Sequence, residues 1–173
     1  MIQSLKRMSH QPTYYPVLTE VQLMELSCFE PLKIFFKVES DLNALDKVLS
    51  HFEQINQGWI SRKDWLQCQL ALAEGFTNAV RHAHKGLSPT IPIEIEITLT
   101  NEQIKIMIWD YGNPFNLPQF LKENVTSDNY WSSHGRGLSI LQQIADHLDY
   151  IRTEQNRNCL IIIKQFPNQQ ENQ

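Results

Sequence analysis

The sequence predicts an α+β fold, a two-layer sandwich in which a mixed, mostly antiparallel sheet of about five strands carries three helices on one face. Two observations lead to this prediction. In several short runs, apolar residues alternate with polar ones, which is typical of strands with one buried and one wet face. Between these runs, apolar residues recur every three or four positions, as in amphipathic helices. Because the strands keep one face wet, the helices must all cover the other face.

Length and composition agree with one globular domain. The chain has 173 residues, of which 42% are hydrophobic and 20% charged, enough for a buried core. The formal net charge is −4 and no basic block is present, so nucleic acid is not expected as a direct partner. No apolar run is long enough to span a membrane and no secretion signal is recognisable, so we expect no membrane partner and a cytoplasmic protein.

The cysteines indicate neither a disulfide framework nor a zinc site. Three are present, far apart and without a CxxC pair: Cys28, Cys68 and Cys159. We expect them to be reduced thiols of the core.

The beginning of the chain differs from the rest. Residues 1–32 contain three prolines and no sustained period, so we interpret them as an N-terminal extension with at most a short helix over 19–29. Residues 33–166 carry the periodic pattern of the domain. Residues 167–173, rich in Gln and Asn, are expected to be a flexible tail.

The first half of the domain predicts one strand and two helices. The strand begins at Lys33, and Ser40 or Asp41 can cap the helix after it. This helix has an apolar face formed by Leu42, Leu45, Val48, Leu49, Phe52 and Ile55. The longest helix begins near Ser61, whose hydroxyl is placed as an N-cap, and runs toward His84.

The second half is richer in strands. Alternating isoleucines predict an antiparallel hairpin over 93–108. Residues 111–134 show little periodicity, and so long a connection within one domain suggests a functional lid. A helix over 137–147 and two strands, over 150–153 and 159–166, complete the domain.

Polar residues form a narrow stripe on the longest helix. Its members are Glu74, Asn78, Arg81 and Lys85, and apolar residues border it near Glu74. A solvated helix face would explain such a stripe, and so would the wall of a pocket. Since Glu74 and Asn78 are four residues apart, they point the same way and can offer a carboxylate and an amide oxygen to one water or cation.

A second motif, Asp110-Tyr-Gly112, stands where the hairpin ends. In one interpretation it is a turn in which Asp110 caps its own backbone and Gly112 supplies a positive φ. In the other, Asp110 accepts a hydrogen bond from a ligand amine and Gly112 lets a flat ligand approach the backbone.

A third motif, Ser133-His-Gly135-Arg136-Gly137-Leu138, leads into the helix over 137–147. Glycines before a helix N-terminus leave amide N–H groups free for an anion, as at a phosphate site. A flexible hinge would have the same composition. The motif is neither a Walker A loop nor a GxGxxG fingerprint.

Taken in order, the three motifs resemble the N, G1 and G2 boxes of the GHKL ATPase superfamily, with the closest likeness to bacterial anti-sigma-factor serine kinases. The resemblance covers residues 33–166 and implies a Bergerat-type ATP site. It assigns Asn78 as the Mg²⁺ ligand, Glu74 as the catalytic base, Asp110 to the adenine amine and Gly112 beneath the base. It assigns the phosphates to Gly135, Arg136, Gly137 and Leu138.

Two places depart from the pattern of this superfamily. Pro114-Phe115 follows the second motif where many relatives carry a further glycine. In the last strand, relatives often place a threonine near the adenine, and this chain has Asn158-Cys159-Leu160. The resemblance therefore leaves open whether adenine recognition is altered.

The resemblance implies a serine/threonine protein kinase that transfers the γ-phosphoryl group of MgATP to a STAS-type antagonist protein. Arg136 would add charge near the phosphates, and Arg81 and Lys85 would steer the substrate. For Lys85, a place on a solvated helix face is the favoured alternative. It also implies a possible homodimer and a sigma factor as a possible second partner. An alternative is a non-catalytic, ATP-gated module that sequesters a sigma factor or antagonist. A third interpretation, the ATP domain of a sensor histidine kinase, lacks a visible membrane span or phosphoacceptor helix before residue 33.

Overall fold

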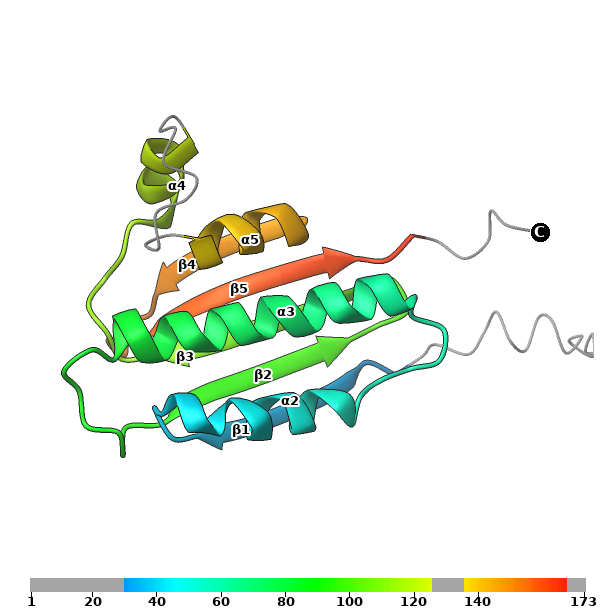
Figure 1. The fold of residues 1–173 in the computed structure, drawn as a ribbon, viewed down its shortest axis with the longest axis horizontal. Helices are drawn as coiled ribbons and strands as arrows, with labels where there is room; N and C mark the ends of the chain where they lie inside the picture. Colours follow the sequence, from blue (N-terminus) through cyan, green and yellow to red (C-terminus); the bar gives the residue numbers. More distant parts are fainter. Residues whose placement is uncertain (1–29, 126–135, 168–173) are drawn as a thin grey trace, which may run out of the picture.

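Five strands and four α-helices make up the part of the chain that the structure, a computed structural model, describes, residues 30–125 and 136–167 (Figure 1). The strands are β1 (Leu32–Val38), β2 (Ile93–Leu99), β3 (Gln103–Asp110), β4 (His147–Arg152) and β5 (Asn158–Gln165). The α-helices are α2 (Leu45–Glu53), α3 (Arg62–Asn78), α4 (Leu117–Val125) and α5 (Arg136–Ile144). A 3₁₀ turn, η1 (Leu42–Ala44), precedes α2, and a π-helix, η2 (Ala79–Ala83), continues α3.

The strands form one sheet in the order β1-β2-β3-β5-β4. Every neighbouring pair described is antiparallel, so the sheet is antiparallel throughout rather than mixed. The hairpin of β2 and β3 pairs Leu99 with Ile104, as the alternating isoleucines predict. Because β5 lies between β3 and β4, the end of β3 is next to the last strand of the chain.

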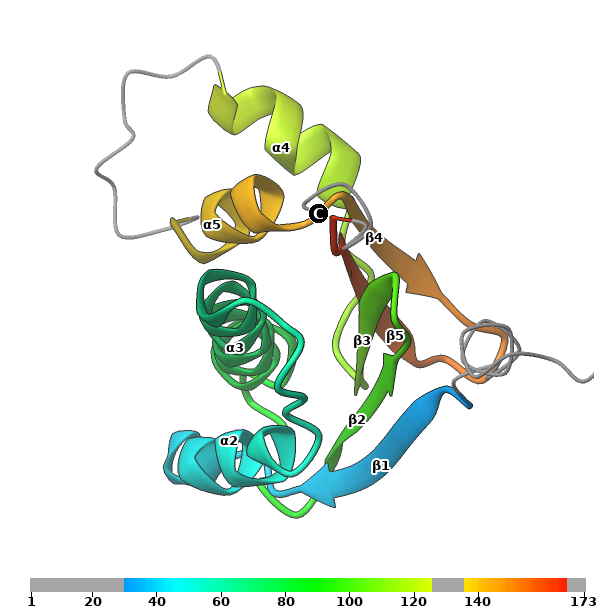
Figure 2. The ribbon, with the colours of Figure 1, turned by 90° about the vertical axis from the view of Figure 1, so that its right-hand side faces the viewer.

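The helices α2, α3 and α5 cover one face of the sheet, and no helix of the described residues covers the other (Figure 2). The isoleucines of β2 and β3 that face these helices are at most 1% exposed: Ile93, Ile95, Ile97, Ile104, Ile106 and Ile108. Phe52 of α2 stacks on Trp65 of α3 with ring centroids 4.1 Å apart. This arrangement confirms the predicted α+β sandwich, with the core between helices and sheet.

The predicted helix starts are also correct. Ser61 accepts a hydrogen bond from the Asp64 N–H through its Oγ at 3.1 Å, as an N-cap does. Of the two candidates before α2, Asp41 is the capping residue, because its Oδ1 accepts from the Asn43 N–H at 2.9 Å. It caps the 3₁₀ turn η1, and the α-helix begins only at Leu45.

Two helix ends differ from the prediction. The longest helix keeps α geometry only to Asn78, and the π-helix η2 then follows, where the His84 N–H donates to the Ala79 carbonyl at 2.8 Å. The last helix ends at Ile144 rather than near 147. Two residues later, the Asp146 N–H donates to the Ile163 carbonyl of β5 at 2.9 Å. The backbone therefore pairs with the sheet from this residue on and cannot continue the helix.

The predicted long loop contains a helix that the sequence pattern did not indicate. In α4, Asn116 Oδ1 accepts from the Gln119 N–H at 3.0 Å, and Leu117 is 1% exposed. With only nine residues, α4 is too short for its apolar residues to show a recognisable helical period in the sequence. The rest of the predicted lid (126–134) lies outside the described residues, as do the extension up to residue 29, with its predicted short helix, and residues 168–173.

Two of the three cysteines fall in the described part of the chain. Cys68 and Cys159 are both buried and unpaired, in agreement with the prediction, whereas Cys28 lies outside. Burial raises the pKa of each thiol to about 12, so both stay protonated and unreactive. Of the helices described, none is long and apolar enough to cross a membrane.

Candidate functional site

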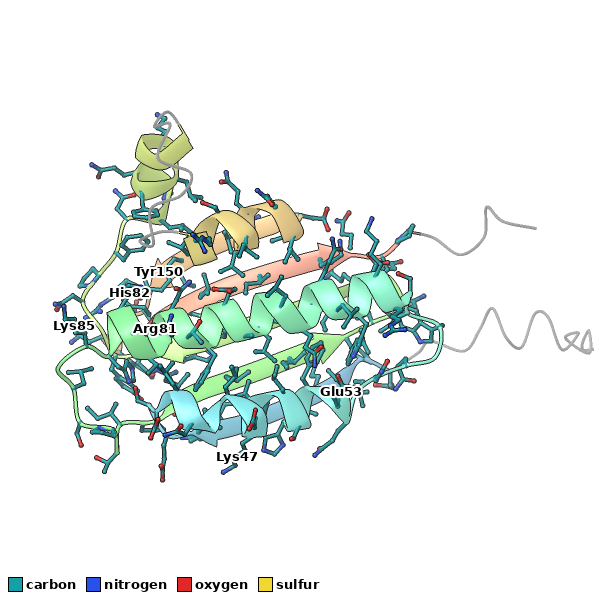
Figure 3. The ribbon with its side chains drawn as sticks, viewed as in Figure 1. Lys47, Glu53, Arg81, His82, Lys85 and Tyr150 are labelled. Atoms are coloured by element: carbon teal, nitrogen blue, oxygen red, sulfur yellow. The ribbon has the colours of Figure 1, made fainter. Side chains whose placement is uncertain are left out.

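A cavity of about 560 Å³ lies where the end of α3, η2, the end of β3, α4, α5 and β4 meet. Its wall is mainly apolar, and Asn78, Asp110 and Tyr150 are among the polar residues that line it. His82 and Lys85 line it as well, and Figure 3 shows them at the end of α3 nearest Tyr150. An apolar cavity with a few convergent polar groups is the usual form of a small-molecule site.

Asp110 is the polar centre of this cavity. It is 2% exposed, and both of its carboxylate oxygens accept hydrogen bonds. Oδ1 accepts from the Gly112 N–H at 2.8 Å and from Asn158 Nδ2 at 2.7 Å. Oδ2 accepts from the Tyr150 hydroxyl at 2.7 Å. Since a carboxylate has about four acceptor positions, Oδ2 keeps one for a ligand donor.

The turn interpretation of the second motif made two statements, one on Asp110 and one on Gly112. The first is confirmed and the second is wrong. Asp110 does cap its own turn through the Gly112 N–H. Gly112, however, has no positive φ, and Gly86 is the one glycine with a positive φ in the described chain. Gly112 is required because a Cβ there would lie 2.7 Å from Ala83 Cα and closer still to its carbonyl oxygen. The place of Gly112 beneath an adenine stays a prediction.

A second layer of hydrogen bonds holds this centre. Asn158 is fully buried, and its Nδ2 donates to the Gly112 carbonyl at 3.1 Å as well as to Asp110. Arg152 Nη1 donates to the Gly112 carbonyl and to Asn158 Oδ1, both at 2.9 Å. Asn158, noted in the sequence only for the missing threonine, therefore fixes the carboxylate in place.

Sequence reasoning missed Tyr150 and Arg152 as site residues. Both lie on β4, and the register pairs Arg152 with Asn158 and Asn158 with Asp110. No local motif marks either residue. The signal that could have found them is the strand order, since it places β5 and then β4 beside the end of β3.

The polar stripe of α3 divides into a buried and an exposed part. Glu74 and Asn78 are half-buried, whereas Arg81 is exposed at the end of the helix (Figure 3). Opposite them stands Gly137 of α5, where a Cβ would lie 2.6 Å from Glu74 Oε2 and 3.2 Å from Asn78 Oδ1. Two predicted motifs therefore meet, the polar stripe and the third motif, whose Gly137 lies in the first turn of α5.

Glu74 and Asn78 have no structural partner in the described chain. No hydrogen bond or ion pair there involves the Glu74 carboxylate, and Asn78 Nδ2 is buried without a partner. A buried polar group without a partner is rare in proteins and needs an explanation. A ligand between α3 and α5 would supply one.

The side-chain oxygen atoms at this place suit a Mg²⁺ ion that a phosphate group binds at the same time. Asn78 offers a hard amide oxygen, and Mg²⁺ prefers few protein ligands together with substrate phosphates and water. The described residues hold no group of three His, Cys, Asp or Glu side chains that would make a complete metal site. Asn78 would hold the ion, which would neutralise phosphate charge when bound.

The first turn of α5 begins beside this pair. Leu138 lines the cavity and Arg136 is exposed at the helix start. The free N–H groups of a helix N-terminus attract an anion. Gly135 lies outside the described residues, so its predicted phosphate contact stays a prediction, as do those of Arg136, Gly137 and Leu138.

His84, the last residue of the first motif, is buried next to the site, and sequence reasoning assigned it no role there. It is 4% exposed, and its Nε2 accepts from the Tyr111 N–H at 3.0 Å. Burial lowers the pKa of this imidazole below its ordinary value of 6.5, and the charge of Asp110 opposes the shift in part. His84 therefore acts as a neutral acceptor that holds the backbone after Asp110.

The departure at Pro114-Phe115 gives the cavity an aromatic wall. Phe115 meets Phe120 at 5.4 Å and the edge of Tyr150 at 5.9 Å between ring centroids. All three residues line the cavity. Aromatic side chains in such a wall favour a flat ligand.

A comparison with protein-family models gives a match over most of the domain. The model described as a histidine kinase-like ATPase domain matches residues 38–164, which is more than half of the chain and includes all three motifs. A comparison with curated proteins gives no match.

Proposed function

Since this chain belongs to the family of histidine kinase-like ATPase domains, we propose that it is an ATP-dependent kinase that phosphorylates a serine or threonine of a partner protein. The family match supports ATP binding and a reaction that uses ATP, without naming the group that accepts the phosphate. The choice of acceptor and partner is our proposal, and it follows the likeness of the three motifs to the anti-sigma-factor serine kinases.

One observation carries the proposal. Glu74 is a half-buried carboxylate beside Asn78, and neither side chain is committed to a partner in the described chain. A carboxylate with no structural role, four residues from a suitable Mg²⁺ ligand, is placed to accept a proton next to the phosphates. A site that only binds nucleotide needs no such base.

The proposed step is a direct transfer. The partner's hydroxyl oxygen attacks the γ-phosphorus of ATP, a new O–P bond forms, and the bond from that phosphorus to the bridging oxygen of ADP breaks. The hydroxyl proton passes to Glu74. Because phosphoryl transfer depends mainly on positioning and charge, Asp110 and the start of α5 contribute by holding the nucleotide.

We propose a STAS-type antagonist protein as the substrate and a sigma factor as a second partner. The cations of the polar stripe support a docking role, because Arg81 and Lys85 are both exposed and Lys85 lines the cavity (Figure 3). Opposite charge on a partner would steer it toward the γ-phosphate.

The test is the variant Glu74→Gln, which keeps the size of the side chain and removes the proton acceptor. We expect nearly normal ATP affinity, because Asp110 and Asn78 are untouched, and a loss of phosphoryl transfer of about 10²–10⁴-fold. ATP affinity, melting temperature and single-turnover transfer from γ-labelled ATP to a purified STAS protein are measured on one preparation. Glu96→Gln, on the open face of the sheet, is the matched control and should transfer normally.

Transfer by Glu74→Gln at the wild-type rate would contradict the role of Glu74. Loss of stability or of ATP affinity in this variant would indicate a structural role instead. If the wild type binds ATP but transfers phosphate to no STAS protein offered, the kinase proposal fails and the ATP-gated binding module replaces it.

A further inference from the structure

The hydroxyl of Tyr150 stands beside the one acceptor position that Asp110 keeps for a ligand. Tyr150 donates to Asp110 Oδ2 at 2.7 Å and lines the cavity. Among the described residues that line this cavity, it is the one with a hydroxyl group. A ligand donor that binds Oδ2 must therefore come within reach of this hydroxyl.

The other polar neighbours of Asp110 use their hydrogen-bond donors on partners within the protein. Both hydrogens of Asn158 Nδ2 are used, on Asp110 and on the Gly112 carbonyl, and its Oδ1 accepts from Arg152. Asp110 Oδ1 already accepts two hydrogen bonds. Asn158 therefore positions the carboxylate and has no hydrogen left to donate to a ligand. On Asp110 itself, Oδ2 has acceptor capacity left for a ligand, with the Tyr150 hydroxyl beside it.

We propose that Tyr150 reads the nucleotide base together with Asp110. When the exocyclic amine of adenine donates to Asp110 Oδ2, the Tyr150 hydroxyl rotates about its C–O bond and donates to an acceptor nitrogen of the ring that flanks the amine. This inference rests on the proposed binding of ATP.

This pair of groups selects adenine over guanine. Asp110 accepts and Tyr150 donates, and adenine offers an amine donor flanked by ring acceptors at N1 and N7. Guanine carries a carbonyl oxygen in place of that amine, and this oxygen would face the carboxylate. A site built for a hydrogen-bond donor rejects an acceptor strongly, because both partners are left unpaired.

Tyr150 is held ready for this role. Its N–H donates to Asp149 Oδ1 at 2.7 Å, its ring meets Phe115 edge-on, and β5 pairs it with Leu160. Burial, and next the hydrogen bond to Asp110, raise the pKa of Tyr150 above its ordinary value, while the charge of Arg152 acts in the opposite sense. The hydroxyl therefore stays protonated and keeps its hydrogen to donate.

The test combines a protein variant with altered nucleotides. Calorimetry measures the affinity of the wild type and of Tyr150→Phe for ATP, 1-deaza-ATP and 7-deaza-ATP, each of which lacks one ring acceptor. We expect Tyr150→Phe to bind ATP about tenfold more weakly. One deaza nucleotide should bind the wild type more weakly by a similar factor, and Tyr150→Phe should weaken its binding no further. Which nucleotide it is identifies the ring nitrogen.

The control variant is Tyr111→Phe, since Tyr111 does not line the cavity and should leave all three affinities unchanged. Melting temperatures establish that both variants fold. If Tyr150→Phe weakens all three nucleotides equally, or none, the hydroxyl does not read the base and the inference is wrong. A wild type that binds no ATP would overturn the proposed function as well, so the two failures are distinguishable.

Discussion

At the scale of residues, Asp110 shows how a buried carboxylate serves structure and binding together. Three donors from the protein hold it, the Gly112 N–H, Asn158 and Tyr150. Two of these share Oδ1, so Oδ2 keeps capacity for a ligand. The turn interpretation and the binding interpretation of Asp110 are therefore compatible, because the two roles use different acceptor positions.

Gly112→Ala should destabilise the protein by about 1–3 kcal/mol, because the new Cβ would meet backbone atoms of Ala83 that cannot move aside as a side chain can. Urea denaturation measures the free energy of unfolding. The matched control is Gly58→Ala, where no atom lies within 4 Å of the new Cβ and φ is not positive. That change should be neutral or slightly stabilising. Equal stability of the two variants would contradict the proposed contact.

At the scale of elements, the end of α3 is shaped by a change of helix type. The α-helix gives way to the π-helix η2 at Ala79, directly after Asn78, and single π turns are frequent at functional sites. The wider turn brings Ala83 against Gly112 and places buried His84 at the backbone after Asp110. This element thus joins the first two motifs, which are separate in the sequence.

The start of the same helix supports a prediction about its N-cap. Ser61→Ala removes the acceptor for the Asp64 N–H and should lower the free energy of unfolding by about 1 kcal/mol. Ser50→Ala is the control, since the Ser50 hydroxyl donates only to the Asp46 carbonyl within α2 and alanine favours a helix. Urea denaturation of both variants checks this. A loss as large for Ser50→Ala as for Ser61→Ala would refute the capping role.

At the scale of the whole molecule, the site forms where one end of the sheet meets the helix layer. The ends of β3 and β4, the start of β5, the end of α3 and the start of α5 all gather there (Figure 1). Each contributes few polar groups, and together they enclose the cavity. The stability of this region therefore depends on groups from distant parts of the chain.

The free energy of unfolding of the whole protein should decrease as the pH is lowered, in part because of His84. Its pKa in the folded protein is below the ordinary 6.5, so the unfolded chain takes up the proton first as the pH falls. The stabilising contribution is complete above 6.5 and is lost as the pH falls toward the lower folded pKa. His84→Gln, which keeps an acceptor for the Tyr111 N–H, should weaken this dependence.

Urea denaturation at about pH 7.5 and about pH 5.5 measures the effect, because the two values bracket the ordinary histidine pKa. The control is His147→Gln at the exposed start of β4, which should keep the wild-type difference between the two pH values. Parallel pH dependence of the wild type and His84→Gln would show that His84 does not carry the effect.

The sequence by itself determined the succession of the five strands and of the helices α2, α3 and α5 along the chain, the hairpin of β2 and β3, and the Ser61 cap. These features depend on periodicity and on neighbours within a few residues, and such short-range patterns are readable in one chain. The motifs at Asn78, Asp110 and Gly137 were found in the same way, because each is compact in the sequence. Their likeness in order to one superfamily agrees with the family match over residues 38–164.

Only the tertiary structure decided which other residues complete the site. Tyr150 reaches Asp110 across 40 positions and Asn158 across 48, through the strand order β3-β5-β4. The reason for Gly112 lies in Ala83, and the π-helix depends on no local signal that the sequence shows. Helix α4 was missed because one short apolar face is too weak a pattern. Contacts of this kind arise when distant strands pair, and pairing between strands is a property of the folded sheet rather than of any local stretch of sequence.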